Sequence, residues 1–291
     1  MTRPGARLLA AAATLAAIPV VAACAGAPAG DGGGGPTTAG GPAREEVPPS
    51  QLVGLWRVDA EGESEDTWVQ IGSPYSPHDL TLWRECGAIS GWWLPGAGAM
   101  LTSIESWSGA CGDGAGAVDW LLAVDGFAAD GEDRVLLDAE GEVLATLSLD
   151  GEPPPHPDVA DELRTQPELT EEQAAELDVR PEPLPNGTEP AAAEEVLGRW
   201  VPVETYETDP FIELLDDGTW TGSDGCNGVG GRWLLDDELV LLVTSGPQTL
   251  IGCEGENLGS MLVGSAWLVV DGDTLTFYDA EGTVIGEAAR G

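Results

Sequence analysis

An internal repeat constrains this chain more than any other feature of its sequence. Two stretches share five anchor motifs, which occur in the same order and at nearly constant spacing. The paired anchors are Leu52–Trp56 with Val196–Trp200, Cys86–Trp93 with Cys226–Trp233, Cys111 with Cys253, Trp120–Leu122 with Trp267–Val269, and Asp138–Val143 with Asp279–Val284. A unit of about 95 residues can own a hydrophobic core, unlike a solenoid repeat. We therefore predict two similar domains, at residues 51–150 and 195–291.

Both copies have the sequence pattern of short β-strands. In the second copy, β-rich runs are separated by Asp216–Gly218 and Asp271–Asp273, which are typical turn sequences. Only Glu254–Gly264 has the apolar spacing of a helix. The predicted fold class is mainly β (α+β), with two small antiparallel sheets or partly closed barrels that each carry at most one short helix. Calcium binding is an alternative role for the acidic turns, but neither matches a calcium-loop motif, so we predict no metal site.

The charge composition excludes several classes of function. The 291 residues include 51 Asp and Glu but only 11 basic residues, all of them Arg, for a formal net charge of −40. Such a chain repels a phosphate backbone, so we predict no nucleic-acid partner. Without Lys there is no phosphate-loop or Schiff-base lysine, and two His cannot form a three-His metal site. We predict no cofactor.

The N-terminal residues 1–23 are typical of a bacterial export signal. Arg3 and Arg7 precede the apolar run Leu8–Ala23, which is short for a membrane span of about 20 residues. The run ends in Val-Ala-Ala-Cys, which resembles a lipobox, so Cys24 is the predicted lipidation site and first mature residue. Residues 24–50, rich in Gly and Pro, are the predicted flexible tether. We expect an exported protein anchored by lipid on the extracytoplasmic face of the cell membrane; the alternative is ordinary cleavage, with Cys24 incidental.

An acidic linker rich in Pro and Glu, residues 151–194, joins the two copies. Thr170–Gln173 matches a capping box that opens a short acidic helix through Leu177. We predict a solvated helical spacer, and a helix docked on a domain is the alternative. His156 lies between prolines in this linker and is predicted to be exposed and without a role.

With Cys24 set aside, each copy contains two cysteines. Four cysteines allow three pairings, but the duplication favours pairing within each copy. We therefore predict the structural disulfides Cys86–Cys111 and Cys226–Cys253, as expected in an oxidising compartment. No CxxC motif occurs that would indicate a redox or zinc site.

Tryptophan is unusually frequent, with eleven Trp beside three Tyr and three Phe. Three pairs recur at equivalent places and are predicted to pack in the cores, namely Trp56 with Trp200, Trp93 with Trp233, and Trp120 with Trp267. The Trp residues without an obvious counterpart are Trp68, Trp83, Trp92, Trp107 and Trp220. If Trp92 and Trp93 lie in a strand, they point to opposite faces of the sheet, and an exposed Trp can anchor a ligand.

Catalytic motifs are weak in this chain. His78 is the sole His of the predicted domains, it lacks an equivalent in the second copy, and no Gly-x-Ser-x-Gly elbow is present. A carboxylate pair can hydrolyse glycosides, but among 51 acids any single pair carries little meaning. We predict no catalytic residues and no enzyme activity. The alternative is a secreted acidic hydrolase that uses a carboxylate pair.

A set of motifs spans nearly the whole second copy, Val196–Ala288. They are Leu197–Trp200, Asp217–Gly222 running into Gly225–Asn227, Gly231–Trp233, Thr249–Cys253 and Gly272–Leu275. Together they resemble the META (heat-shock HslJ-like) domain family, whose most specific element is the run Gly225, Cys226 and Asn227, followed here by Gly231 and Trp233. The first copy resembles the family as a diverged version, with Gly87 in place of the Asn. The family occurs in exported bacterial proteins, some linked to stress or antibiotic tolerance, and has no established catalytic residues, so the resemblance implies fold and location rather than an activity.

These observations favour a non-enzymatic lipoprotein of the cell envelope, with tandem META-like domains that bind something or protect the envelope under stress. The expected partners are the membrane, through the lipid, and an unknown envelope protein or small ligand. A passive spacer is a third hypothesis. An apolar, Trp-lined concavity on either domain would favour binding over the other roles.

Overall fold

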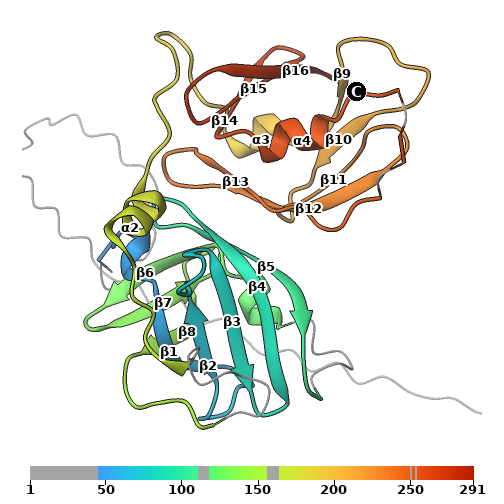
Figure 1. Cartoon of the computed structure of the whole chain (residues 1–291). Helices are drawn as coiled ribbons and strands as arrows, with labels where there is room; N and C mark the ends of the chain where they lie inside the picture. The colour runs from blue at the N-terminus through green and yellow to red at the C-terminus, as the bar shows by residue number, and fades with distance from the viewer. Residues whose placement is uncertain (1–44, 111–117, 156–163, 250, 253) are drawn as a thin grey trace, which may run out of the picture. The chain divides into compact units, whose positions relative to one another are not determined.

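The computed structural model describes residues 45–110, 118–155, 164–249, 251–252 and 254–291 (Figure 1). Two eight-stranded antiparallel sheets and four short helices make up this part of the chain, which confirms the predicted mainly β fold class. The export signal, Cys24, Cys111, His156 and Cys253 lie outside the described residues. Within the described ranges, no helix has both the length and the apolar character needed to cross a membrane.

Both sheets are built from eight strands in the same order. The first contains β1 (Gly54–Ala60), β2 (Trp68–Ile71), β3 (Asp79–Arg84), β4 (Gly87–Pro95), β5 (Met100–Trp107), β6 (Gly126–Asp130), β7 (Asp133–Leu137) and β8 (Val143–Ser148). The second contains β9 (Gly198–Pro202), β10 (Phe211–Leu214), β11 (Thr219–Ser223), β12 (Gly228–Leu235), β13 (Leu241–Val243), β14 (Trp267–Asp271), β15 (Thr274–Tyr278) and β16 (Val284–Arg290). Their orders are β5-β4-β3-β2-β1-β8-β7-β6 and β13-β12-β11-β10-β9-β16-β15-β14. The repeat in the sequence is therefore a repeat of topology, and we call the two units the first and second domain.

The same type of turn joins β7 to β8 in the first sheet and β15 to β16 in the second. In the first domain, the Asp138 carboxylate accepts hydrogen bonds from the backbone N–H groups of Glu140 (3.0 Å) and Glu142 (2.8 Å). Asp279 makes the equivalent two bonds in the second domain, at 3.1 and 2.8 Å. Gly141 has a φ of +79°, a conformation that Gly adopts without steric cost. The recurring Asp-Ala-Glu-Gly sequence is thus explained by turn chemistry.

Neither sheet closes into a complete barrel, but the outermost strands of each sheet meet at one end. In the first domain, Met100 at the start of β5 donates its backbone N–H to the carbonyl of Asp125, just before β6, at 3.0 Å. Leu241 and Ala266 form the equivalent bond between β13 and β14, at 2.9 Å. The predicted partly closed form therefore arises from one corner contact in each domain.

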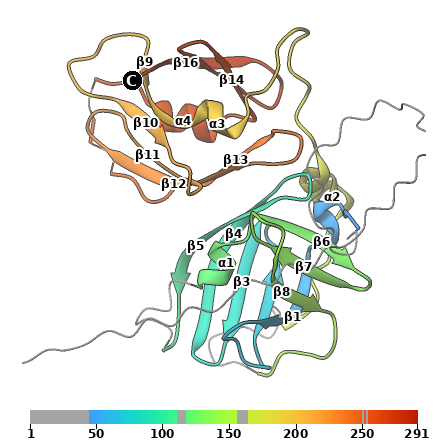
Figure 2. The ribbon, with the colours of Figure 1, turned by 180° about the vertical axis from the view of Figure 1, so that it is seen from behind.

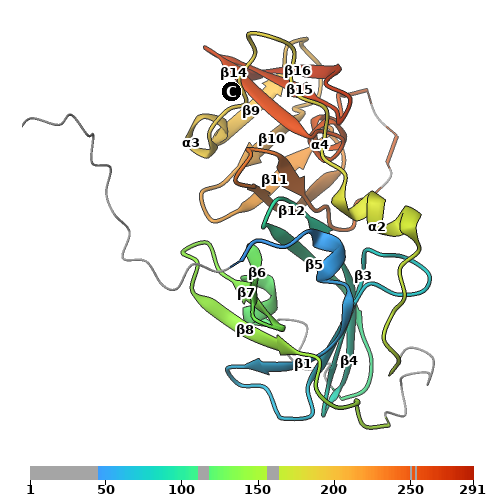
Figure 3. The same ribbon diagram turned by 90° about the vertical axis from the view of Figure 1, so that its left-hand side faces the viewer.

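A short helix supplies apolar side chains to the core of each domain. Helix α1 (Asp119–Leu122) packs on β5 and β8 (Figure 2) and buries Leu121 completely. Helix α4 (Leu258–Val263) packs on β10 and β11 (Figure 3) and buries Leu258 and Leu262. The two domains have separate cores, each with one fully or nearly fully buried Trp from its first strand, Trp56 or Trp200.

One predicted equivalence between the copies is wrong. Trp120 lies in helix α1, whereas Trp267 begins strand β14. In the topology, the counterpart of β14 is β6, which begins at Gly126 after the helix. The short Trp-Leu motif therefore occupies different elements in the two copies, and only the other two Trp pairs lie in matching strands.

The linker helix is docked, so the predicted solvated spacer is wrong. Helix α2 (Glu171–Asp178) begins with the predicted capping box, in which Thr170 accepts from the backbone of Gln173 at 3.2 Å. It lies against the 3₁₀ turn Pro49–Gln51 (Figure 1), and Leu177 is only 1% exposed in the core of the first domain. The Asp178 carboxylate also accepts two hydrogen bonds from Ser50, at 2.8 and 2.6 Å. Burial of Leu177 and the hydrogen bonds of Asp178 stabilise the docked position of the helix, although its other face is acidic.

The part of the linker that follows α2 belongs to the second domain. The backbone N–H of Glu182 bonds to Ala280 at 2.8 Å, and that of Ala191 bonds to Leu268, also at 2.8 Å. Leu184 packs beside Trp267 in a small apolar cluster. Helix α3 (Ala193–Val196) then crosses the predicted domain start at residue 195 and buries Val196. The change from one domain to the other thus falls close to Val179 rather than along the whole linker.

Candidate functional site

A pair of tryptophans forms an apolar site on the outer face of the first sheet. Trp68 in β2 lies directly opposite Trp83 in β3, and each is 4% exposed. Their strand neighbours Val69 and Leu82 point to the main core, so the two indoles lie on the other face. Cross-strand aromatic pairs stabilise a sheet and present flat ring faces.

A pocket of about 150 Å³ lies beside this Trp pair. Its lining combines the two indoles and two prolines with four charged side chains, namely Trp68, Trp83, Pro153, Pro154, Asp66, Arg84, Glu85 and Arg164. The charges are two acids and two arginines, so they balance. This is the kind of apolar, Trp-lined concavity that we expected of a binding protein.

Described residues that follow β8 lie beside this face, because Pro153, Pro154 and Arg164 line the pocket. Arg164 donates from Nη2 to the carbonyl of Pro153 at 2.7 Å. Gln166 bonds to both backbone groups of Leu55, accepting from its N–H at 2.9 Å and donating to its carbonyl at 2.8 Å. Its side chain takes the place of a neighbouring strand at that point of β1.

The indole N–H of Trp83 is buried and has no hydrogen-bond acceptor among the described residues. Eight other indoles donate to an acceptor: Trp56, Trp92, Trp93, Trp120, Trp200, Trp220, Trp233 and Trp267. A buried donor without an acceptor costs about 1–3 kcal/mol. Such a cost is retained in few places of a native fold.

The second domain has no equivalent of this site. Gly91 and Gly231 occupy matching positions, because each lets a neighbouring strand approach closely. An added Cβ would lie 1.8 Å from the carbonyl oxygen of Ser103 at Gly91 and 2.0 Å from that of Thr244 at Gly231. Ala88 lies three residues before Gly91 and pairs with Trp83, and Gly228 lies three residues before Gly231 and pairs with Ser223. Ser223 therefore stands where the first domain has Trp83. The Trp site is therefore a feature of the first domain alone.

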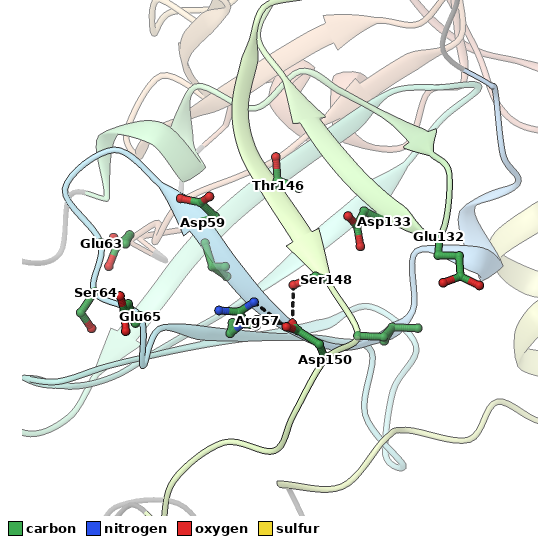
Figure 4. Close-up of a pocket in the computed structure, with 12 residues that line it drawn as sticks. Arg57, Asp59, Glu63, Ser64, Glu65, Glu132, Asp133, Thr146, Ser148 and Asp150 are labelled. Atoms are coloured by element: carbon green, nitrogen blue, oxygen red, sulfur yellow. Dashed lines mark hydrogen bonds and ion pairs between the residues drawn. The ribbon is translucent and has the colours of Figure 1, made fainter.

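An acidic cleft of about 750 Å³ lies elsewhere on the first domain (Figure 4). Its lining includes six carboxylates, Asp59, Glu63, Glu65, Glu132, Asp133 and Asp150. Arg57 binds Asp150 with two hydrogen bonds of 2.9 and 2.6 Å, and Ser148 adds a third at 2.7 Å (Figure 4). These bonds lower the pKa of Asp150 below its ordinary value, Arg57 having the largest effect. Asp150 is therefore held as a carboxylate, which is unsuited to donating a proton.

Glu63 of the same cleft has a structural task. Its carboxylate accepts hydrogen bonds from Arg84 and from the indole of Trp120, both at 2.9 Å, and from Thr67 at 3.2 Å. The side chain is only 4% exposed. Glu63 thus joins the β1–β2 turn to β3 and helix α1 and is not available to a substrate.

The residues of the predicted family motif are structural in this fold. Asn227 is 3% exposed, and its side chain makes four hydrogen bonds, donating to Asp224 and Ile251 and accepting from Thr249 and Ile251, at 2.7–2.8 Å. It fastens the segment around Ile251 to the turn at Asp224. The bonds use both ends of the amide, so no group of this side chain is left for a ligand.

The other motif residues allow close packing. Gly225 has a φ of +98°, and an added Cβ would lie 2.3 Å from Thr208. Gly231 lets β12 approach the carbonyl of Thr244, as described above. Trp233 is buried, and its indole donates to the carbonyls of Thr219 (3.0 Å) and Leu215 (3.2 Å).

Cys86 and Cys226 are disulfide-bonded. Their predicted partners, Cys111 and Cys253, lie outside the described residues, so the pairing stays a prediction. Cys24, the predicted lipidation site, also lies outside them.

The acidic turns of the second domain show turn geometry. Asp217 accepts two hydrogen bonds from Thr219, and Gly218 and Gly272 have positive φ angles of 75° and 60°. In the parts of the chain that the structure describes, no group of three or more His, Cys, Asp or Glu side chains is placed to hold a metal ion.

His78 and Trp92 take part in local contacts. One ring nitrogen of His78 lies 3.2 Å from the carbonyl oxygen of Trp93, and the other lies 3.6 Å from Glu176 of α2. Trp93 is fully buried, whereas Trp92 is half-buried and donates to Glu105 at 2.9 Å. The two neighbouring indoles therefore do point to opposite faces, but the aromatic pocket is formed by Trp68 and Trp83. Trp68 and Trp83 belong to the five Trp residues without an obvious counterpart, and no sequence signal separated them from the other three.

Comparison of the chain with protein-family profiles, with curated proteins and with solved structures found no match.

Proposed function

We propose that this protein is a non-enzymatic, lipid-anchored component of the cell envelope that binds a small apolar ligand in the pocket between Trp68 and Trp83. The observation that carries the proposal is the pocket itself, an apolar concavity bordered by Trp68, Trp83, Pro153 and Pro154. In this proposal the second domain, which lacks the pocket, is a structural copy. The proposed family is META, on the motifs described above.

Anchoring by lipid is proposed from the N-terminal sequence. A diacylated Cys24 would hold the folded domains at the membrane through a Gly- and Pro-rich tether. Cys24→Ala should release the protein from membranes and remove the mass of the lipid from the mature chain. A variant that stays in the membrane fraction with an unchanged mass would rule out lipid attachment at this residue.

The disulfides Cys86–Cys111 and Cys226–Cys253 belong to the same proposal of an exported protein. Peptide mapping under non-reducing conditions should recover these two pairs and no other. A peptide that joins cysteines from different copies would contradict the independent oxidation of each domain.

Ligand binding is tested with the full chain carrying Cys24→Ala, which needs no detergent. The protein is mixed with a solvent extract of cell envelopes, separated from unbound compounds and denatured, and the released compounds are identified by mass spectrometry. We expect a small apolar compound that Trp107→Ala retains and Trp83→Ala does not, because Trp107 is 53% exposed and is not among the residues that line the pocket. Circular dichroism confirms that both variants are folded.

Two outcomes would refute the proposed binding role. One is that no compound is retained, and the other is that Trp83→Ala retains the same compound in the same amount. If Trp83→Ala does not fold, the indole ¹⁵N–H signals of the unsubstituted chain take its place. The retained compound must then shift signals of the Trp pair and leave that of Trp107 unchanged.

The acidic cleft supports a second candidate function, a hydrolase that works with a carboxylate pair. Arg57 holds the Asp150 carboxylate ionised, so Asp150 would be the base or nucleophile of such a pair and another carboxyl group of the cleft would have to donate the proton. The test is hydrolysis of a panel of glycosides by the same chain. Turnover that disappears in Asp133→Asn but not in Asp216→Asn would favour the hydrolase over the binding protein.

A further inference from the structure

From the exposure and hydrogen bonding of the Asn side chains, we propose that Asn186 is a modification site, at which the folded protein deamidates spontaneously. The chain contains three Asn residues, and Asn186 and Asn227 are each followed by Gly. Asn is among the thermolabile residues. A following Gly favours its reaction, because Gly has no Cβ to hinder the approach of its backbone nitrogen to the Asn side chain. The proposal is independent of ligand binding, since Asn186 lies in the linker and does not line the Trp pocket.

The reaction joins two neighbouring residues and consumes one water molecule. The backbone nitrogen of Gly187 bonds to the side-chain carbonyl carbon of Asn186 and gives up its proton to the solvent. The bond from that carbon to Nδ2 breaks, and this nitrogen takes up a proton and leaves as ammonia, so that a cyclic imide remains. Water then adds to either carbonyl of the imide and opens it, which yields an aspartate or an isoaspartate. The reaction therefore needs no oxidant, cofactor or enzyme.

Asn186 lies in an exposed turn of the linker. A hydrogen bond of 3.0 Å from the backbone N–H of Thr188 to the carbonyl of Pro185 closes the turn. Gly187 has a φ of +87°, which Gly adopts without steric cost. Asn186 and Gly187 are both exposed, and a Cβ built on Gly187 would meet no atom within 4 Å. The surroundings of the turn therefore leave room for the Asn186 side chain to rotate toward the backbone nitrogen.

Few interactions resist this rotation. Within the described ranges, the side chain of Asn186 makes no hydrogen bond to another residue. An exposed turn with so few contacts opens at little cost in free energy. The folded state should therefore protect Asn186 only weakly against deamidation.

The other Asn-Gly pair is protected by the fold. Asn227 is 3% exposed, and its Nδ2 atom, the leaving group of the reaction, donates to Asp224 and to the carbonyl of Ile251, both at 2.8 Å. Its Oδ1 atom accepts from Thr249 at 2.8 Å and from the backbone N–H of Ile251 at 2.7 Å. The side chain cannot turn toward Gly228 until these four bonds break, so its deamidation requires local unfolding. The same dipeptide is thus reactive in the linker and protected in the second domain.

The modification should leave the second domain folded. It adds a negative charge to a chain whose formal net charge is already −40, and an isoaspartate also lengthens the main chain within the turn. The bonds that anchor this segment lie on either side of the turn, from Glu182 to Ala280 and from Ala191 to Leu268, both at 2.8 Å. Modified molecules therefore accumulate in the folded state, and their fraction rises with the age of the protein.

The test follows deamidation in the full chain carrying Cys24→Ala. One sample is kept folded in mildly alkaline buffer, and a second is kept in the same buffer with denaturant and reductant. Peptides taken at intervals are analysed by mass spectrometry, with chromatography to separate aspartate from isoaspartate. In the folded sample, Asn186 should be converted at least about tenfold faster than Asn227, whose four hydrogen bonds must first break. In the denatured sample, the two residues should be converted at similar rates.

Two glycine variants form a matched pair. Gly187→Ala should slow the conversion of Asn186 about tenfold, because its methyl group hinders the attacking nitrogen. The slower rate should persist in denaturant, which separates this steric effect from a change in the turn. Gly228→Ala is the control, because a Cβ built there meets no atom within 4 Å, and it should leave the rate at Asn186 unchanged. Circular dichroism of aged, modified protein checks that the second domain stays folded.

Three results would overturn the proposal. The first is that Asn186 stays unmodified in the folded sample while the denatured sample is converted. The second is equal conversion of Asn186 and Asn227 in the folded sample, which would mean that the fold does not select the site. The third is that Gly187→Ala reacts as fast as the unsubstituted chain. If that variant does not fold, the comparison of the folded and denatured samples decides the question without it.

Discussion

The indole N–H of Trp200 donates a hydrogen bond to the backbone carbonyl of Val196, four residues earlier, at 2.7 Å. Trp56 makes the same bond to Leu52 at 2.9 Å in the first domain. In both cases an Arg guanidinium lies over the ring, Arg290 over Trp200 at 4.1 Å and Arg134 over Trp56 at 5.6 Å. The opening motif of each copy thus fixes the start of the first strand to the segment that precedes it.

Trp200→Phe should destabilise the second domain by about 1–3 kcal/mol, because the carbonyl of Val196 loses its buried donor. Trp56→Phe should have a similar effect on the first domain. Denaturant unfolding followed by circular dichroism measures both changes. Trp107→Phe, at a half-exposed position, is the control and should change stability by less than about 0.5 kcal/mol. A loss in only one domain would mean that the two bonds are not equivalent.

Leu177→Ala should destabilise the first domain by about 2–4 kcal/mol, because this side chain from the linker helix is 1% exposed in the core. Val179, two residues later, is 68% exposed and provides the matched control. Val179→Ala should be nearly neutral. Thermal unfolding of the two variants gives the comparison. Equal melting temperatures would indicate that α2 does not dock in solution.

The second domain should fold alone, and its part of the linker should raise its stability. A fragment of residues 179–291 keeps Leu184, Ala191 and the Glu182–Ala280 backbone bond, whereas a fragment of residues 196–291 loses them. We expect both oxidised fragments to unfold cooperatively, and the longer one to melt several degrees higher, by about 4–8 °C for each kcal/mol retained. Near-UV circular dichroism on heating tests this. A broad transition in both fragments would show that the second domain does not fold without the first.

Asn227→Ala should cost more than an ordinary helix-cap substitution in the same domain. It removes four hydrogen bonds at a 3% exposed site, and we expect a loss of about 3 kcal/mol. Asn257→Ala removes one bond, to the N–H of Ser260 at the start of α4, and should cost about 1 kcal/mol. Hydrogen exchange should also speed up at Ile251 in the first variant only. Similar losses for the two variants would contradict the fastening role of Asn227.

Acid should weaken the second domain partly through Asp224. The Asn227 side chain, together with the backbone N–H groups of Asn227 and Cys226, lowers the pKa of Asp224 below its ordinary value. A pKa that is lower in the folded state gives stability that is complete above about pH 4 and is lost as pH falls through the folded pKa. The variant Asp224→Asn should therefore lose less stability than the unsubstituted chain between about pH 6 and pH 3. An NMR titration of Asp224 provides the pKa directly, and a value above the ordinary one would contradict the assignment.

The sequence alone was sufficient to predict those features that depend on residues close together in the chain. The Asp-Ala-Glu-Gly turns, the capping box at Thr170 and the alternation of short strands depend on residues within a few positions of one another. Because the same turn and strand sequences recur in the same order, the duplication also predicted two similar sheets. Cys24 and the two disulfide pairings are predictions of the same kind that the described residues do not test.

Tertiary structure decided what depends on residues far apart in the chain. Gln166 reaches Leu55, and Ser50 reaches Asp178, across more than a hundred residues, so the docking of the linker could not be derived from its acidic, solvent-compatible composition. The same holds for Trp68 and Trp83, which the sequence marks only as tryptophans without counterparts. Strand register placed them side by side on the outer face, and Pro153, Pro154 and Arg164 border a pocket beside them. Local sequence determines which conformations a segment prefers, whereas burial is determined by which distant segments it meets, and in this protein the candidate site is a product of burial.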